Sequence, residues 1–272
     1  MATSTARDFL TDPQVRESIL ADYRRTGVAI LTDVYEPPEI AQMRATWTAI
    51  GESRRGEGKK PHATLLMTHL SDPRVASAVR NRNLVRAVEG LLGGKIELIQ
   101  SQLMFGQPGT KGFSPHQDNF YNRAQPADGI IAAWIALEDV DETNGCLAVF
   151  PGSQLKGLAA TRRDWMYLLS RSPDVVKSLV QLASPGKRGQ PNDSGVIERF
   201  VYAEIPKDIQ PMSVVLKAGS VAFMHGDLIH LSYPNNTPDR FRRSLLTNFV
   251  REGTQFNAGK LTGRLPFDVY AS

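Results

Sequence analysis

Apolar runs of strand length recur along the chain from residue 95 onward. Glycine, proline and asparagine, which mark turns, separate one run from the next. Short runs with this punctuation favour an antiparallel sandwich or barrel over βαβ units. The runs cover residues 95–105, 129–140, 145–153, 212–224, 228–233 and 242–250.

Helical signals dominate residues 1–94 instead. Asp12-Pro13 predicts a helix N-cap followed by proline at the first helical position, with apolar residues then repeating on one face. We expect such helices to cover the outside of a β core. The other expected elements are a strand at 27–33, helices starting at Pro37, Pro73 and Asn83 with the last ending before Gly90, and a polar loop at 51–61.

A long interruption at 155–210 breaks the strand pattern. It contains a helical piece at 173–183 and a polar, glycine- and proline-rich piece at 184–195. Insertions of this length in a compact domain are commonly lids or loops. We therefore predict one domain over residues 1–272, mainly β with flanking α-helices. Its expected parts are a mostly helical cover (1–94), a β core (95–154 and 211–251) and a lid-like insertion (155–210).

Composition excludes several protein classes. No stretch of the chain approaches the roughly 18 consecutive apolar residues of a membrane span, and the opening MATSTARDFL lacks the features of an export signal. The single cysteine, Cys146, fits a reducing compartment. The net charge is only +4, and the basic residues are scattered without the spacing of a nucleic-acid module. We expect a soluble, cytoplasmic protein that binds neither membranes nor nucleic acids.

The sharpest local motif is the H-x-D triplet at 116–118. Positions i and i+2 of an extended segment face the same side, so His116 and Asp118 can bind one metal ion while Gln117 points away. Such triplets also arise by chance, and alone this one is weak evidence.

A second group of polar residues lies on the last two runs. His230 and Ser232 share one strand face, and Arg242, Ser244, Leu246 and Asn248 share another. Two histidines and one carboxylate form the facial triad of non-haem Fe(II) oxygenases. A 2-oxo acid bound there needs a cation for its remaining carboxylate, and Arg242 fits this need, although an arginine beginning a strand is often only a surface cation.

Taken jointly, these segments resemble the phytanoyl-CoA dioxygenase family of Fe(II)/2-oxoglutarate oxygenases. The resemblance rests on GVAILTDVYEPPEI, HQDNFY, WIALEDVDETNGCLAVFPGS, AGSVAFMHGDLIHLSYPNN and RFRRS. It implies a double-stranded β-helix (jelly roll, cupin-like) core. It also implies that His116, Asp118 and His230, rather than His225, bind iron. Arg242 best matches the arginine that anchors 2-oxoglutarate, with Arg240 as the alternative because the spacing after His230 is one residue longer than usual.

The resemblance also suggests further contacts. Ser232, Gln102 and Tyr121 are candidate contacts of 2-oxoglutarate. The alternatives are an ordinary strand hydroxyl for Ser232, a solvent-facing side chain for Gln102 and packing at the barrel mouth for Tyr121. Where many relatives carry a lysine before the Pro-Gly of the first barrel strand, this chain has Gln107. The candidate substrate contacts, each of which could equally pack the core or the barrel mouth, are Phe105, Asn119, Phe120 and Trp134.

The implied activity is hydroxylation of an unactivated C–H bond of a small molecule, such as a natural-product or amino-acid-like metabolite. The cosubstrates are O2 and 2-oxoglutarate, and the products include succinate and CO2. Halogenating relatives lack the carboxylate that Asp118 provides. Desaturation, epoxidation or oxidative cyclisation would use the same residues. Two other classes remain open: a zinc-dependent hydrolase or isomerase, and a jelly roll that binds a ligand without turnover. No feature of the sequence indicates an oligomeric state.

Overall fold

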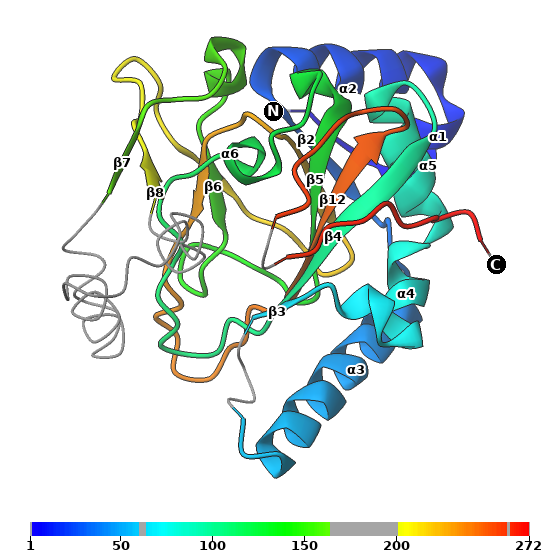
Figure 1. Ribbon diagram of the computed structural model, residues 1–272, viewed down its shortest axis with the longest axis vertical. Helices are drawn as coiled ribbons and strands as arrows, with labels where there is room; N and C mark the ends of the chain where they lie inside the picture. The colour runs from blue at the N-terminus through cyan, green and yellow to red at the C-terminus, as the bar shows by residue number, and fades with distance from the viewer. Residues whose placement is uncertain (1, 60–63, 164–200, 260–261, 272) are drawn as a thin grey trace, which may run out of the picture.

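Two β-sheets form the centre of the molecule, and the computed structural model describes residues 2–59, 64–163, 201–259 and 262–271 (Figure 1). The large sheet contains β1 (Thr3–Thr5), β2 (Val28–Thr32), β3 (Leu65–Leu66), β4 (Ile96–Met104), β5 (Ile130–Ala136), β10 (Val221–His225) and β12 (Ser244–Arg251). Its seven strands follow the order β1-β2-β10-β5-β12-β4-β3. The small sheet contains β6 (Leu147–Val149), β9 (Met212–Val214) and β11 (His230–Ser232), in the order β11-β6-β9.

Antiparallel pairing dominates both sheets, as the run lengths predict. Every pair in them is antiparallel except β1 with β2. Each predicted run contains a strand of one sheet or the other. The prediction of a mainly β fold with flanking helices is confirmed.

Helices cover the outer face of the large sheet, with α1, α2 and α5 beside it in Figure 1. Asp12 caps α2 through hydrogen bonds from the backbone N–H groups of Gln14 and Val15, as its sequence position predicts. The α-helices are α1 (Ala6–Thr11), α2 (Pro13–Thr26), α3 (Pro37–Gly56), α4 (Pro73–Val79), α5 (Arg82–Leu92) and α6 (Asp118–Asn122). The 3₁₀-helices are η1 (Thr68–Leu70), η2 (Ala127–Gly129) and η3 (Ser153–Lys156).

Several predicted boundaries in the first 94 residues were wrong. Helix α3 continues to Gly56 through the start of the expected loop, and Arg54 and Arg55 in its last turn suit the negative end of the helix dipole. Helix α5 begins after Asn81, whose side chain accepts the Leu84 N–H, and it runs through Gly90 to Leu92. The strand expected at 27–33 is β2, and the same part of the chain also supplies β1 and β3 to the large sheet.

Opposite faces of the large sheet carry different side chains. One row across the outer face, which packs against the helices, is wholly aliphatic: Leu31, Val221, Ile135, Leu245 and Leu103. The adjacent row on the inner face, which lies against the small sheet, reads Ile30, Ala222, Trp134, Leu246 and Gln102. The inner face therefore combines small and polar side chains with apolar ones.

The described ends of the insertion form a ribbon of β7 (Thr161–Arg163) with β8 (Val201–Ala203). The helix expected at 173–183 and the polar piece at 184–195 lie outside the described residues. Among the residues described, none of the helices has the length and apolar character needed to cross a membrane.

Candidate metal centre

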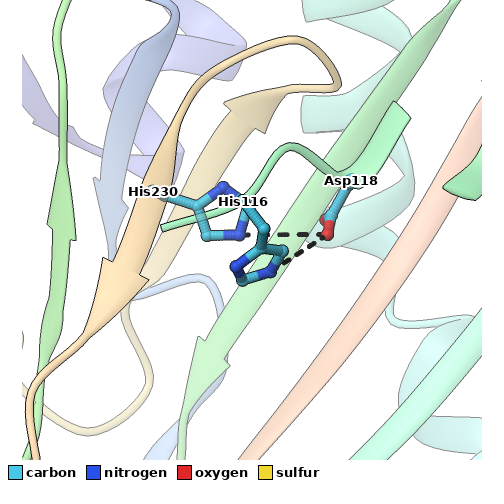
Figure 2. Close-up of side chains that lie close together, drawn as sticks. All are labelled: His116, Asp118 and His230. Carbon is cyan, nitrogen blue, oxygen red and sulfur yellow. Dashed lines mark ion pairs between the residues drawn. The ribbon is translucent and has the colours of Figure 1, made fainter. Parts of the chain in front are cut away.

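Three side chains from two distant parts of the chain converge between the sheets. His116, Asp118 and His230 offer ligand atoms that all lie within 4.8 Å of one another. Asp118 Oδ1 lies 3.7 Å from His116 Nε2 and 3.8 Å from His230 Nε2 (Figure 2). One ion with metal–ligand bonds of about 2.1 Å could therefore contact all three residues.

Backbone hydrogen bonds fix the two histidines against each other. The N–H of His116 donates to the His230 carbonyl at 2.9 Å, and the N–H of His230 donates back at 3.0 Å. Each ring places Nδ1 near a backbone carbonyl oxygen, that of Ser114 at 2.8 Å for His116 and that of Leu228 at 3.0 Å for His230. Because a carbonyl can only accept, Nδ1 carries the proton and Nε2 is left to bind a metal.

The H-x-D segment differs in one respect from the expected strand. Gln117 is extended, with φ −125° and ψ 129°, but Asp118 is already the first residue of α6. The Gln117 side chain turns away from Asp118, as predicted, and donates to the carbonyls of Asp227 at 2.6 Å and Gly157 at 2.9 Å. Its own oxygen accepts the Ala159 N–H at 2.8 Å, which ties the start of the insertion to the H-x-D segment.

Burial lowers the pKa of His116 to about 4. The neighbouring His230 ring lowers this pKa further, and the Asp118 carboxylate opposes both effects. His116 is therefore neutral at pH 7, which is the form that binds a metal ion.

Arg242 is buried between the sheets, just before β12, and is only 2% exposed. Within the described residues, its Nε and Nη1 atoms have no hydrogen-bond partner. Burial lowers the pKa of its guanidinium group to about 10, so the group remains charged at neutral pH. A buried, unpaired charge is costly, and a carboxylate is the anion that an arginine guanidinium group commonly binds.

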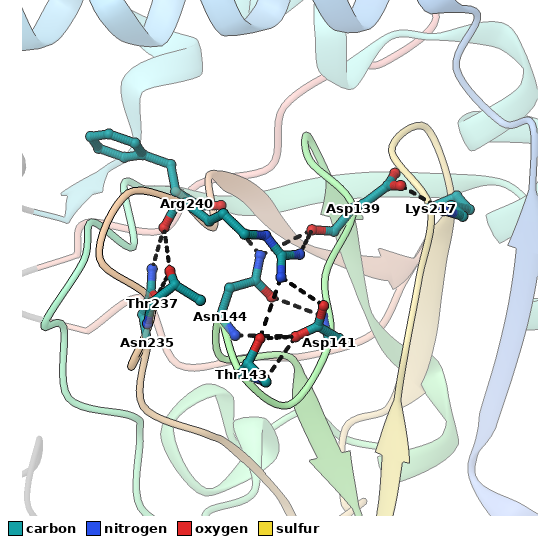
Figure 3. Close-up of polar contacts among 9 residues, drawn as sticks. Asp139, Asp141, Thr143, Asn144, Lys217, Asn235, Thr237 and Arg240 are labelled. Atoms are coloured by element: carbon teal, nitrogen blue, oxygen red, sulfur yellow. Dashed lines mark hydrogen bonds and ion pairs between the residues drawn. The ribbon is translucent and has the colours of Figure 1, made fainter.

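Arg240, the alternative anchor, is engaged at the surface (Figure 3). Its Nη1 lies 2.8 Å from Asp141 Oδ2 and 3.3 Å from Thr143 Oγ1, while Nη2 donates to the Asp139 carbonyl at 3.2 Å. Asn235 braces the same loop by donating to the carbonyls of Arg240 and Gly106. Of the two arginines, Arg242 has the burial and the free donors that a carboxylate anchor requires.

Comparison with models of known protein families shows to which family the chain is related. The family model described as phytanoyl-CoA dioxygenase (PhyH) matches residues 23–244. The chain belongs to the phytanoyl-CoA dioxygenase family. It is 31% identical over 142 residues to phytanoyl-CoA dioxygenase 1 of Oryza sativa subsp. japonica, covering 52% of this chain and 40% of the relative. It is 28% identical over 207 residues to phytanoyl-CoA dioxygenase domain-containing protein 1 of Mus musculus, covering 73% and 62%. The chain thus spans about half the length of the curated relatives it matches.

Solved structures support the same fold. The α-ketoglutarate-dependent carbocyclase SnoK from nogalamycin biosynthesis aligns with a TM-score of 0.68 at 19% identity, over 99% of this chain and 98% of SnoK. EctD from S. alaskensis with 2-oxoglutarate and 5-hydroxyectoine aligns with a TM-score of 0.62 at 16% identity, over 91% and 80%. The expected double-stranded β-helix of the phytanoyl-CoA dioxygenase family is confirmed.

The remaining cosubstrate candidates lie on or beside the inner face. Ser232 Oγ is buried and accepts the Phe113 N–H at 3.0 Å, which leaves its own hydrogen free to donate. Gln102 lies in the inner row of the large sheet, opposite Leu246. The Tyr121 ring lies 6.4 Å from that of His116, measured between centroids.

The four candidate substrate contacts lie in different surroundings. Trp134 lies on the inner face, and its Nε1 has no partner among the described residues. Phe120 packs against Tyr121 at 5.1 Å and beneath the Arg123 guanidinium. Asn119 instead faces Asp227 and the Ala124 N–H, at 2.8 and 2.6 Å. Phe105 is buried in the outer core with the helices, so the structure does not bring it to the triad.

The other described histidines lie apart from the triad. His225 Nδ1 accepts the Asp227 N–H at 3.0 Å, and its ring faces Tyr23 of α2 on the outer side. His69 faces Ser101 Oγ at 2.7 Å, also on the helix side of β4. His62 and Trp165 lie outside the described residues. Sequence reasoning missed one polar contact of the triad, a hydrogen bond from Asn248 to Asp118.

Proposed function

We propose that this protein is an Fe(II)- and 2-oxoglutarate-dependent dioxygenase that hydroxylates an unactivated C–H bond of a small molecule. One observation carries the proposal. The His-Asp-His cluster and a buried arginine with two unpartnered donors occur together inside one jelly roll. Such a triad leaves positions on the ion open for a chelating cosubstrate and for O2.

The donor set of the chain fits ferrous iron and 2-oxoglutarate. His116, Asp118 and His230 would hold the ion, and ferrous iron bound in this way couples the oxidative decarboxylation of 2-oxoglutarate to oxidation of a substrate. Arg242 would bind the distal carboxylate of 2-oxoglutarate, because that anion would give its buried, unpaired guanidinium group a partner of opposite charge. The free hydroxyl hydrogen of Ser232 could donate to the same carboxylate, with Gln102 and Tyr121 completing the cosubstrate site.

The proposed substrate is a natural-product or amino-acid-like metabolite. The structural relatives named above support this class, since one comes from nogalamycin biosynthesis and another was solved with 5-hydroxyectoine. Phe120 and Trp134 are the proposed substrate contacts. Asn119 and Phe105 are omitted because the first binds Asp227 and the second packs in the outer core. We propose no nucleic-acid or membrane partner.

Other outcomes of the same chemistry depend on the substrate. Desaturation, epoxidation and cyclisation would use the same ligands, and the name of the carbocyclase SnoK shows that a related fold forms rings. A zinc hydrolase is the weaker alternative because hydrolysis by a metal-bound water has no need of a buried arginine aimed at a second anion.

The test is anaerobic binding followed by turnover. Adding Fe(II) and 2-oxoglutarate without O2 should produce a weak visible charge-transfer band, and admitting O2 with a screen of small metabolites should release succinate. The Asp118→Ala variant lacks one proposed metal ligand and should lose both signals. Metal-replete protein that shows no such band, or a variant that turns over like the wild type, would refute the assignment.

A further inference from the structure

The carboxylate of Asp118 has two oxygens with different surroundings. Oδ1 faces the two imidazole rings, at 3.7 and 3.8 Å from their Nε2 atoms. Oδ2 accepts a hydrogen bond of 3.2 Å from Asn248 Nδ2. Both residues are buried, with Asn248 only 1% exposed. The two oxygens are therefore distinguished before any ion binds.

Asn248 is an unusual residue for its place in the sheet. It lies in the middle of β12, between β4 and β5, where asparagine is disfavoured and where a buried amide is costly unless it is hydrogen-bonded. The Asn248 side chain is itself buried, so the amide has little access to water. The pairing with β4 shifts register immediately after Asn248, an irregularity that commonly re-aims a side chain beside a site.

We propose that Asn248 is a positioning residue for Asp118, a role that rests on the proposed metal centre. By occupying Oδ2, it holds the carboxylate so that only Oδ1 is presented to the ion. A carboxylate bound through both oxygens would take a position that the cosubstrate or O2 needs. Asn248 thus keeps Asp118 a single-oxygen ligand and keeps the open side of the triad open.

A second set of contacts braces the same pair. Gln100 lies opposite Asn248 on β4, and its Oε1 accepts a 2.6 Å hydrogen bond from Arg264 Nε. Arg264 Nη1 also contacts the carbonyl of Tyr121, in the short helix that Asp118 begins, at 3.4 Å. One buried guanidinium therefore joins the strand beside Asn248 to the helix of Asp118.

The experiment is a Co2+ titration of the full chain without 2-oxoglutarate, followed by visible absorption and by calorimetry. Asn248→Leu keeps a similar volume and removes the amide donor. It should bind Co2+ about 10–100-fold more weakly, the usual effect of losing an outer hydrogen-bond partner of a metal ligand. The Co2+ bands should also change in intensity, since they report coordination geometry. Asn248→Ser retains a shorter donor and should lose less affinity.

Thr247→Val is the matched control. Thr247 Oγ1 donates to the Ala133 carbonyl at 3.2 Å from the opposite face of the same strand. This variant should keep wild-type Co2+ affinity within about twofold, because the two positions share no partner. Equal Co2+ affinity and identical spectra for Asn248→Leu and the wild type would overturn the positioning role but leave the metal centre standing. Equal weakening in Thr247→Val would also overturn it. A wild type that binds no Co2+ would overturn both proposals.

Discussion

The two faces of the large sheet differ in the side chains that they carry. Along β12, Leu245 and Phe249 belong to the outer core beneath the helices. Leu246, Asn248 and Ser244 alternate with them toward the small sheet. Between Leu245 and Phe249 on the outer face, the buried hydroxyl of Thr247 donates a hydrogen bond to the Ala133 carbonyl. The inner side carries the hydrogen bond from Asn248 to Asp118 and, with Arg242 just before the strand, polar atoms without partners in the described part of the chain.

This difference separates stability from function within one strand. Burying apolar groups stabilises the fold, whereas burying polar atoms without partners costs free energy until a ligand satisfies them. The outer face therefore stabilises the sheet, and the inner face carries buried polar groups that the proposed ion and anion would satisfy. Variants on the two faces should alter different measurements.

The largest stability effect is expected on the outer face. Phe249→Ala removes a fully buried ring and should lower the free energy of unfolding by about 3–5 kcal/mol. Urea unfolding checks the loss, and 2-oxoglutarate binding to the folded variant should change by no more than about twofold. If the folded Phe249→Ala protein had lost cosubstrate affinity, the proposed separation between a stabilising outer face and a binding inner face would be contradicted.

The opposite result is expected for Arg242→Met. Removing a buried charge without an ion-pair partner among the described residues should leave the stability of the unliganded protein unchanged or raise it. Binding of 2-oxoglutarate should weaken by about 2–5 kcal/mol, the range for deleting one side of a buried charged contact. Calorimetry on the Co2+-loaded protein measures the affinity. Undiminished binding would remove Arg242 from the cosubstrate site.

On the outer side of the large sheet, the stability of the protein should depend on pH through His69. Burial, with a smaller contribution from Arg80, lowers the pKa of His69 from 6.5 to about 4. The unfolded chain therefore takes up a proton between these pH values that the folded protein does not, so stability falls as pH drops through that window. Between pH 7 and pH 5, His69→Gln should lose about 1–2 kcal/mol less stability than the wild type in urea unfolding. Parallel losses in the two proteins would contradict this assignment.

Sequence reasoning succeeded where one short-range rule decides the outcome. The alternation of strand residues placed His230 with Ser232, and Arg242 with Ser244, Leu246 and Asn248, because side chains of a strand strictly alternate. Proline after an aspartate located the starts of α2 and α4, because that pair satisfies the free N–H groups of a first helical turn.

The features that were missed depend on contacts between distant segments. The bond from Asn248 to Asp118 joins residues 130 positions apart, and no local pattern marks it. Phe105 is a different case. Since Gln102 and Met104 share the inner face, the next residue should point outward, and alternation alone would have placed Phe105 in the outer core. The resemblance to a family suggested the three proposed ligands, whereas the packing of the fold determines which neighbouring residues contact them.

The smallest effect is expected for Arg240→Ala. This variant tests whether the buried Arg242 or the more exposed Arg240, which lies closer to His230 in the sequence, binds the carboxylate of 2-oxoglutarate. Arg240 is 40% exposed on its side chain and pairs with Asp141 at 2.8 Å. Exposed ion pairs are worth about 0–1 kcal/mol, so the variant should lose at most that much stability. Its 2-oxoglutarate affinity should stay within about twofold of the wild type, since Asn235 still holds the loop before Arg242 through the Gly106 carbonyl. Thermal unfolding and calorimetry give both values. A loss of affinity in Arg240→Ala equal to that in Arg242→Met would mean that the surface loop contributes to cosubstrate binding as much as the inner face does.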